Sequence, residues 1–315
     1  MPGRITDGIV ASRQGHMVTA REHIVVTGCA GFIGSHLTDR LLADGHTVVG
    51  IDSFEDYYPR VIKEQNLEGA LANPAFTLHE ANILELAAEG APDGAEVGGA
   101  SGSALAALLR GCARVYHLAA QAGVRASWGS SFEVYTRNNV LATQQLLEAC
   151  VAAEAPKVIY ASSSSVYGDQ DELPLREDMV PRPLSPYGVT KLAGEHLCGL
   201  YHANHGLDTV SLRFFTVYGP RQRPDMAFHK FIQAMLEGRK IVMYGDGTQT
   251  RDFTYVDDIV EGLVLAQKAP PGAVINLGGG NRVSLAEAIA TLGEVMGVEP
   301  RLDVQPVEAG DVRDT

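Results

Sequence analysis

The sequence predicts a doubly wound α/β fold, in which a parallel sheet lies between two layers of helices, together with a smaller second α/β domain. Three observations favour this fold. Short β-branched runs alternate with helical segments over the first two thirds of the chain, as in repeated strand–helix–strand units. The first unit carries three glycines at three-residue spacing between its strand and its helix. Beyond residue 213 the pattern becomes irregular, which indicates a second domain.

The first unit consists of a strand, a helix and a second strand. Three β-branched residues at 24–26 predict a strand that is buried on both faces. Apolar residues recur every four positions over 33–41 and predict one buried face of a helix, which Asp44 and the following glycine end. The apolar run at 47–51 predicts the second strand.

Each glycine of the turn has its own predicted role. Gly28 allows the tight turn, Gly31 lets the backbone approach a pyrophosphate at the helix N-terminus, and Gly34 lets helix and strand pack closely. Asp52 follows the second strand, where its carboxylate can accept hydrogen bonds from an adenosine ribose and would repel a 2′-phosphate. The unit therefore predicts dinucleotide binding and favours NAD over NADP; the alternative is an ordinary strand–helix turn.

The later elements follow from apolar runs and their boundaries. Further strands are predicted at residues 76–79, 115–118, 157–161, 209–213 and 273–277, and helices at 132–153, 187–203, 257–268 and from the capping box at Ser284 onward. Residues 86–103 are rich in alanine, glycine and small polar residues and indicate a flexible insertion or a loose helix edge. Loops are predicted at 169–186, 214–225 and 244–252.

These elements predict three parts of the chain. Residues 1–20 are expected to form a loose extension, because they lack the continuous apolar core of a signal peptide. A nucleotide-binding domain is predicted from 21–213 with 256–277, and a smaller domain from 214–255 with 278–315. No apolar run approaches membrane-spanning length.

Composition limits the partners that the protein can have. A net charge of −13 argues against nucleic acid and against an anionic membrane, but local arginines could still bind an anionic small substrate. The four cysteines are scattered without metal-ligand spacing. We therefore predict no metal site, and we expect a reducing, cytoplasmic setting.

Three polar residues near the predicted cofactor supply candidate chemistry. Ser163 lies in a serine run after the strand at 157–161, where side chains of a parallel sheet point into the binding crevice. Tyr187 and Lys191 lie one helical turn apart. The lysine charge favours the tyrosine phenolate, which can take the proton from a substrate hydroxyl while NAD accepts hydride from the same carbon. The alternative for the serines is a polar turn that caps the next element.

The chain resembles the extended short-chain dehydrogenase/reductases, and among them the NAD-dependent nucleotide-sugar epimerases and dehydratases. The motifs that carry this resemblance lie at residues 27–34, 117–120, 162–168, 187–191, 213–220 and 251–257. The resemblance implies a Rossmann nucleotide-binding domain and a nucleotide-sugar-binding second domain. It also implies that Ser163, Tyr187 and Lys191 are catalytic.

The resemblance also implies two sets of binding residues. The cofactor set is Gly28, Gly31, Phe32, Ile33, Gly34, Asp52, Asn82, Ile83, Leu118, Ala119, Ala120, Gln121, Asn139, Tyr187 and Lys191. The substrate set is Arg125, Ser164, Ser165, Thr216, Arg223, Arg251 and Asp311. The chain departs from many relatives at two of these positions. Where they carry an aspartate that binds the adenine amino group, this chain has Asn82, and where they carry an asparagine it has Thr216. Asn139, whose amide could reach a neighbouring loop or the cofactor, would position the cofactor side, and Arg251 would bind the nucleotide diphosphate.

The serine run bears on the type of reaction. Dehydratases that resemble this chain carry Asp-Glu at Ser164 and Ser165, and the decarboxylases that form UDP-xylose usually carry Glu at Ser165. The segments 121–125, 214–219 and 223–227 resemble UDP-glucuronate 4-epimerases. The resemblance therefore implies conversion of UDP-glucuronate to UDP-galacturonate through a 4-keto intermediate, with hydride returned to the opposite face.

Several alternatives remain open at this point. UDP-glucose or UDP-N-acetylglucosamine 4-epimerase is the main one, and UDP-glucuronate decarboxylase or a non-catalytic NAD-binding protein is more remote. Arg223 and Thr216 are predicted to recognise the sugar carboxylate; the alternative is that Arg223 only ties down its own loop through Asp225. Relatives commonly dimerise through two helices, so a homodimer is expected through those at 132–153 and 187–203.

Overall fold

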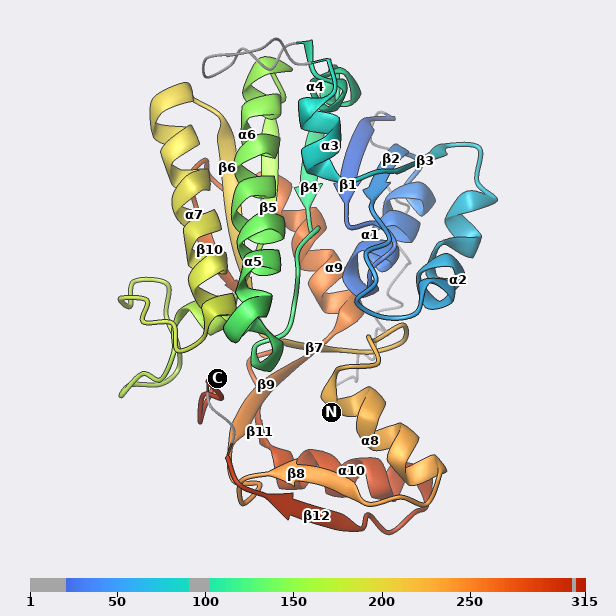
Figure 1. Cartoon of the computed structure of the whole chain (residues 1–315), viewed down its shortest axis with the longest axis vertical. Coiled ribbons are helices and arrows are strands. Elements are labelled where there is room, and N and C mark those ends of the chain that lie inside the picture. The colour runs from blue at the N-terminus through green and yellow to red at the C-terminus, as the bar shows by residue number, and fades with distance from the viewer. Residues whose placement is uncertain (1–20, 91–101, 308–309) are drawn as a thin grey trace, which may run out of the picture.

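We describe a computed structural model of the chain for residues 21–90, 102–307 and 310–315 (Figure 1). Predictions for residues 1–20, and for 91–101 within the 86–103 insertion, lie outside the described residues. The strands are β1 (His23–Thr27), β2 (Thr47–Asp52), β3 (Phe76–Glu80), β4 (Arg114–His117), β5 (Lys157–Ser163), β6 (Asp208–Phe214), β7 (Thr216–Tyr218), β8 (Ile241–Tyr244), β9 (Thr250–Tyr255), β10 (Val274–Leu277), β11 (Arg282–Ser284) and β12 (Leu302–Gln305). The α-helices are α1 (Phe32–Ala43), α2 (Arg60–Leu71), α3 (Ile83–Ala88), α4 (Ala104–Leu109), α5 (Phe132–Tyr135), α6 (Ala142–Ala152), α7 (Pro186–His205), α8 (Ala227–Leu236), α9 (Val256–Leu265) and α10 (Leu285–Met296).

The central sheet confirms the predicted fold class. Its seven strands have the order β10-β6-β5-β4-β1-β2-β3, and every neighbouring pair is parallel. The chain runs outward from β1 to β3, returns to β4 beside β1, and then runs outward again. Ligands of such sheets bind beyond the carboxyl ends of the strands, where the strand order reverses. The site is therefore expected above β1 and β4.

Two layers of helices cover the sheet. Because successive strand residues point to opposite faces, Ile24 and Val26 of β1 pack with Leu37 of α1, whereas Val25 packs in a second cluster with Leu146 of α6. Helices α1, α2 and α9 lie on the first face, and α3, α4, α6 and α7 on the second (Figure 1). Burial on both faces explains why the central strands read as continuous apolar runs.

The remaining strands lie outside the central sheet. β8 and β12 form a parallel pair that packs on α8 and α10 around Phe231, Met235, Ile241 and Ile289. β7, β9 and β11 form a three-stranded sheet between this pair and the central sheet (Figure 1). β10, in contrast, joins the central sheet beside β6. This distribution supports the proposed division into 21–213 with 256–277 and 214–255 with 278–315.

Several elements differ from the predictions. Helix α2 was not predicted because its buried face includes Lys63 and Asn66 beside two apolar residues, which hides the helical hydrophobic pattern. Helix α4 was also missed, and β7 and β9 lie in segments that the sequence indicated as loops. β7 has only three residues, and β9 has one fully buried side chain, Thr254, so neither shows an apolar alternation.

The helix predicted over 132–153 is not uniform. A π-helical segment, Thr136–Leu141, separates α5 from α6. Such wide turns are rare and often occur at functional sites. The segment buries the side chain of Asn139.

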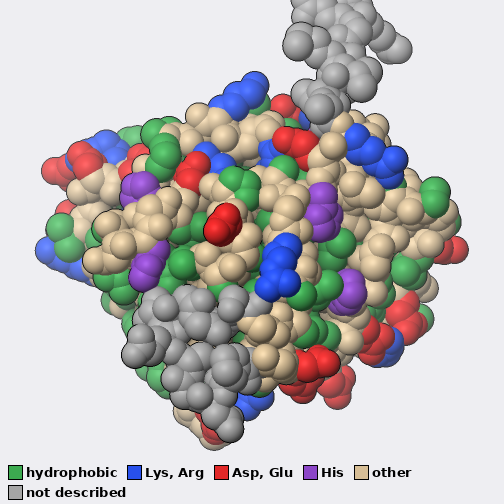
Figure 2. Space-filling model, turned by 90° about the horizontal axis from the view of Figure 1, so that it is seen from above, with side chains coloured by type: hydrophobic (Ala, Val, Ile, Leu, Met, Phe, Trp, Pro, Cys, Tyr) green, Lys and Arg blue, Asp and Glu red, His purple; other side chains and the backbone are tan. Residues whose placement is uncertain are grey.

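The surface carries interspersed charges. Figure 2 views the molecule from above, relative to Figure 1, and shows acidic and basic side chains mixed over this face. In the part of the chain that the structure describes, no helix is both long and apolar enough to cross a membrane.

Candidate active site

The glycine turn between β1 and α1 fits a pyrophosphate. Gly28 has a φ of +72°, and a Cβ atom there would lie 2.7 Å from the backbone nitrogen of Ala119. A Cβ atom at Gly34 would lie 2.0 Å from the Gly28 carbonyl oxygen, so only glycine lets the helix pack this closely on the turn. Gly31 is the N-cap of α1, and no described side chain caps that helix end. The first N–H groups of α1 are therefore open to a phosphate.

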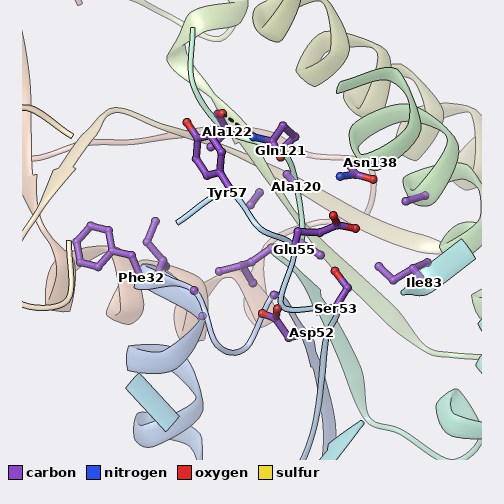
Figure 3. A pocket seen from close by; sticks show the side chains of 18 of the residues that line it. Phe32, Asp52, Ser53, Glu55, Tyr57, Ile83, Ala120, Gln121, Ala122 and Asn138 are labelled. Carbon is purple, nitrogen blue, oxygen red and sulfur yellow. Dashed lines mark hydrogen bonds between the residues drawn. The ribbon is translucent and has the colours of Figure 1, made fainter. Parts of the chain in front are cut away.

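A cavity of about 230 Å³ lies beyond the carboxyl ends of β1, β2, β4 and β5. Figure 3 shows Asp52 at the end of β2, Ser53 and Glu55 on the segment that follows, and Ala120 and Gln121 on the loop after β4. The predicted cofactor residues that line this cavity are Gly28, Gly31, Phe32, Ile33, Gly34, Asp52, Asn82, Ile83, Leu118, Ala119, Ala120, Gln121, Tyr187 and Lys191. Segments that are far apart in the sequence therefore line the same cavity.

Asp52 lies at the end of β2 and faces a lysine that the sequence reasoning missed. Its carboxylate accepts hydrogen bonds from the backbone N–H groups of Ala30 (3.0 Å) and Phe54 (2.9 Å). Burial raises the pKa of Asp52, and the positive charge of Lys63 opposes that shift. Lys63 also lines the cavity, and its Nζ donates to the Glu55 carbonyl oxygen at 2.7 Å. A cation beside Asp52 reduces the repulsion that Asp52 alone would exert on a 2′-phosphate.

Asn82 lines the cavity, but its amide also has a structural role. Its Oδ1 accepts from Leu84 N at 2.9 Å and caps α3, and its Nδ2 donates to Glu55 Oε1 at 3.2 Å. One lone pair of Oδ1 is thereby used within the protein. The predicted hydrogen bond from an adenine amino group would use the other lone pair.

Asn139 is not among the residues that line the cavity, and its role toward the cofactor stays a prediction. It lies beneath the loop after β4, where its Oδ1 accepts from Gln121 N at 2.7 Å and its Nδ2 donates to Gln121 O at 2.9 Å. Its Nδ2 also donates to Thr190 Oγ1 at 3.0 Å. The neighbouring Asn138 lines the cavity instead. The reason is the π-helical turn, which directs Asn139 at the loop backbone.

Ser163, Tyr187 and Lys191 lie together at the end of β5 and the start of α7. Ser185 caps α7, because its Oγ accepts from Gly188 N at 3.1 Å, and Pro186 takes the first helical position. Tyr187 hydrogen-bonds the Ser163 side chain. Lys191 Nζ donates to the Ala161 carbonyl oxygen at 2.8 Å. Tyr187 and Lys191 both line the cavity, whereas Ser163 reaches it through Tyr187.

Burial is the largest influence on the pKa values of Tyr187 and Lys191. Burial raises the pKa of Tyr187; the hydrogen bond from Ser163 and the charge of Arg223 oppose the shift. Burial also lowers the pKa of Lys191 to about 8, against the charge of Glu195. The sequence assigned the phenolate-favouring charge to Lys191. That role of Lys191 stays a prediction; the charge of Arg223 also favours the phenolate, and Lys191 donates to the β5 backbone.

Arg223 is the predicted substrate residue that lines the cavity. Its Nε and Nη2 donate to Asp225 at 2.9 and 3.0 Å, and Asp225 also accepts from the Tyr57 hydroxyl at 3.0 Å. Both interpretations of Arg223 therefore have a basis: it ties down its loop, and it faces the cavity. Thr216, its predicted partner, does not line the cavity; it starts β7 and lies in register with Phe253.

Three further predicted substrate residues form a separate cluster. Arg125 pairs with Asp311 at 2.6 Å and lies 4.1 Å above the Tyr244 ring. The guanidinium of Arg251 donates to the carbonyl oxygens of Thr250 and Val312, both at 2.8 Å. None of the three charged residues lines the cavity. The segment 310–315 runs beside β9 and supplies the carbonyl groups of Val312 and Arg313, which the sequence could not indicate.

The other serines lie beside Ser163 at the end of β5 and in the turn that follows it. Ser164 and Ser165 lie in the turn after β5, where Ser165 N donates to Ser163 Oγ at 3.1 Å, and neither lines the cavity. Ser162 does line it, although the sequence reasoning did not select it. Its hydroxyl donates to Glu195, which also forms a buried ion pair with Arg213 at 2.7 Å.

Hydrogen bonds to a residue far along the sequence hold the segment between β5 and α7. The Tyr167 hydroxyl donates to Asn276 Oδ1 at 2.7 Å, and Asn276 Nδ2 donates to the Leu175 carbonyl oxygen at 2.9 Å. Asn276 belongs to β10, at the edge of the central sheet. The loop that leads to Tyr187 is thus attached to the last strand of that sheet.

The parallel sheet, the glycine turn and the tyrosine–lysine helix beside the cavity define a dinucleotide-binding enzyme of the short-chain dehydrogenase/reductase class. Comparison with known proteins gives the particular family. The model of the NAD dependent epimerase/dehydratase family matches residues 24–278, and the chain belongs to that family.

Relatives and solved structures match almost the whole chain. A Bacillus subtilis protein described as an uncharacterized UDP-glucose epimerase, YtcB, is 42% identical over 93% of this chain and 88% of its own. The UDP-glucuronate 4-epimerase of Thermodesulfobacterium geofontis is 37% identical over 93% of this chain and 86% of its own. The crystal structure of the Bacillus cereus UDP-glucuronic acid 4-epimerase with UDP-glucuronic acid and NAD is 45% identical, with a TM-score of 0.85 over 93% of this chain and 89% of that one.

Proposed function

We propose that the chain catalyses the NAD-dependent 4-epimerisation of UDP-glucuronate to UDP-galacturonate. One observation carries this proposal: Tyr187, Lys191 and Arg223 line the same cavity as the glycine turn. A proton-accepting hydroxyl and a guanidinium that suits a carboxylate thus lie beside a dinucleotide site. The named relatives and the B. cereus structure support the same reaction.

The residues around the cavity suit the two proton transfers of such a reaction. NAD, when bound, accepts hydride from C4 of the sugar and returns it. Tyr187 takes the proton from the C4 hydroxyl and gives it back after the 4-keto sugar has turned over. Ser163 hydrogen-bonds Tyr187 and steadies the same oxygen. Because burial raises the pKa of Tyr187, the phenolate depends on nearby positive charge, which Arg223 supplies.

The turn after β5 favours epimerisation over elimination. Ser164 and Ser165 occupy the positions at which the resembling dehydratases place an acid and a base. Uncharged serine hydroxyls cannot replace the carboxyl groups that act as acid and base in the removal of water. The same positions lack the glutamate of the UDP-xylose-forming decarboxylases, which makes that activity the remoter alternative.

Arg223 is the residue that we propose for the sugar carboxylate. Its Nε and Nη2 bind Asp225, and its Nη1 is the donor that we assign to the substrate. Thr216 and the Ser164 and Ser165 hydroxyls remain the proposed additional holders. A carboxylate held away from the plane of the C4 carbonyl would be protected from loss as carbon dioxide.

Arg251, Arg125 and Asp311 are proposed to bind the nucleotide diphosphate end. Burial lowers the pKa of Arg251, and the charge of Arg125 lowers it further against that of Asp311. The carboxylates of Asp314 and Asp169 also act on Arg251. An added diphosphate would accept charged hydrogen bonds from both guanidinium groups. A diphosphate would replace the backbone carbonyl groups that Arg251 now contacts.

We also propose a homodimer and a cytoplasmic location. The expected dimer helices expose apolar side chains at Val134, Leu141, Val189 and Leu200. A reducing compartment fits the four free, buried cysteines.

One experiment tests the proposed reaction. Purified protein is incubated separately with UDP-glucuronate, UDP-glucose and UDP-N-acetylglucosamine, and the products are resolved by NMR. We expect UDP-galacturonate from the first at the highest rate. A higher rate with UDP-glucose would replace the proposal by the alternative that the B. subtilis relative suggests. No turnover of any sugar by protein that retains NAD would establish a binding protein.

A further inference from the structure

A line of buried polar side chains lies beneath the loop after β4. His117, the last residue of β4, is 1% exposed. Its Nδ1 lies 2.8 Å from Thr27 Oγ1 on β1, and its Nε2 lies 3.0 Å from Thr143 Oγ1 on α6. Thr143 Oγ1 donates to the Asn139 carbonyl oxygen at 2.6 Å, and Thr27 Oγ1 accepts from Ala119 N at 3.2 Å.

These contacts fix the tautomer of His117. The Thr143 hydroxyl has one hydrogen, and that hydrogen goes to a carbonyl oxygen, which can only accept. Thr143 must therefore accept from His117 Nε2–H. A neutral imidazole has one N–H group, so Nδ1 is an acceptor and the Thr27 hydroxyl donates to it. Every hydrogen bond from Ala119 N–H to the Asn139 carbonyl then points in one direction.

The surroundings keep His117 neutral. Burial lowers the pKa of His117 to about 3, and the charge of Lys191 on α7 adds to that shift. The Tyr160 ring of β5 lies 5.8 Å from the imidazole, and its hydroxyl donates to the Lys191 carbonyl oxygen at 3.5 Å. The imidazole is therefore neutral near pH 7.

The two ends of this chain of hydrogen bonds meet at the same loop. One end holds Ala119 N through Thr27, and the other holds the segment of Asn139, whose side chain binds both backbone groups of Gln121. Ala119 and Gln121 both line the cavity. Asn139 Nδ2 also donates to Thr190, whose hydroxyl donates to the Tyr187 carbonyl oxygen at 2.8 Å. The side chain of Asn139 is thus hydrogen-bonded both to the loop and to the first turns of α7.

We propose that His117 is a positioning residue that, through Thr27, Thr143 and Asn139, holds the loop at residues 119–121 in the shape that receives the dinucleotide. This inference rests on the proposed function only in taking the cavity as the dinucleotide site. It concerns cofactor affinity and needs no sugar. A failure of the sugar assay would therefore leave it standing.

Thr143→Val tests the inference, because valine keeps the shape and removes the hydroxyl. We expect NAD affinity, measured by calorimetry without sugar, to fall roughly tenfold, the worth of about one hydrogen bond. Thr143→Ser restores the hydroxyl and should restore the affinity. Thr209→Val is the matched control: Thr209 is also buried and donates to the Cys198 carbonyl oxygen at 3.0 Å, away from the cavity. It should lose stability and keep its NAD affinity.

Nitrogen NMR of histidine-labelled wild-type protein supplies a second readout. The His117 signal should show a protonated Nε2 and an unprotonated Nδ1, unchanged between pH 6 and 8. A protonated Nδ1 would overturn the direction of the hydrogen bonds, even if Thr143→Val failed to fold. Equal NAD affinities for Thr143→Val, Thr209→Val and wild type would overturn the positioning role.

Discussion

Tyr57 and Asp225 join the two sides of the cavity by a hydrogen bond of 3.0 Å. Tyr57 follows β2 on the nucleotide side, whereas Asp225 lies between β7 and α8 on the sugar side. The same carboxylate holds Arg223, so the position of the proposed substrate guanidinium depends on a contact from the nucleotide-binding side. The pKa of Asp225 stays below its ordinary value: burial would raise it, but Arg223 and Tyr57 more than offset that cost.

Arg223→Ala should change substrate preference. A charged hydrogen bond to the sugar carboxylate is worth roughly 1.5–3 kcal/mol, so kcat/KM for UDP-glucuronate should fall about tenfold or more. Turnover of UDP-glucose should fall less, and a loosened carboxylate should release some UDP-pentose. Asp225→Asn separates the two interpretations of Arg223, because it weakens the loop contact and leaves the guanidinium. If both variants lose stability and neither changes the preference, Arg223 has only a structural role.

Tyr187→Phe should remove the acid–base group and keep the ring. We expect turnover to fall by roughly 10²–10⁴, with UDP-sugar binding largely intact by calorimetry. Tyr135→Phe is a control for losing a tyrosine hydroxyl beside the site, since the Tyr135 hydroxyl donates to the Ala122 carbonyl oxygen at 2.8 Å and the two rings lie 6.3 Å apart. Near-normal turnover by Tyr187→Phe would exclude the proposed mechanism.

Asp52 should make the protein select NAD. A carboxylate that faces a 2′-phosphate costs several-fold to roughly hundredfold in affinity. Mass spectrometry of the cofactor released from purified protein should therefore find NAD. Asp52→Asn should reduce the preference for NAD over NADP, because the charge of Lys63 then acts without an opposing carboxylate. Mainly NADP in the wild-type protein would remove this role from Asp52.

Lys191 should make stability depend on pH in alkaline solution. Its pKa is about 8 in the folded protein, against about 10.4 in an unfolded chain. Between these values the unfolded chain holds more protons, so the free energy of unfolding should rise with pH, by about 3 kcal/mol at most. Urea unfolding from pH 7.5 to 10 measures this rise, which Lys191→Met should lack. Parallel curves for the two proteins would show that the lysine keeps its ordinary pKa.

The nucleotide-binding half was predictable because its signals are local. The strand, glycine turn and helix of the first unit follow from apolar spacing, and Gly28 and Gly34 are required by close backbone approach. Lys63 could not be found in this way, since it lies on a helix whose buried face is partly polar. Its role depends on where the segment after β2 folds.

The sugar side was less predictable because its contacts join distant segments. Arg251 was assigned from its motif, but its guanidinium contacts depend on the path of residues 310–315. Asn139 was predicted to reach a neighbouring loop or the cofactor, and it contacts Gln121 of the loop after β4 from a π-helical turn that apolar spacing does not indicate. A motif therefore indicated which segment of the chain carries a polar side chain, but it did not indicate which atoms that side chain hydrogen-bonds.

The contact between Tyr167 and Asn276 has a consequence for the order in which the protein matures on the ribosome. The two residues are 109 positions apart, and synthesis at roughly 5–20 residues per second separates their appearance by roughly 5–20 s. During that interval the strands up to β6 can assemble, while the loop before Tyr187 still lacks its attachment to β10. The attachment of the loop before Tyr187 is therefore expected to form only after β10 has been synthesised.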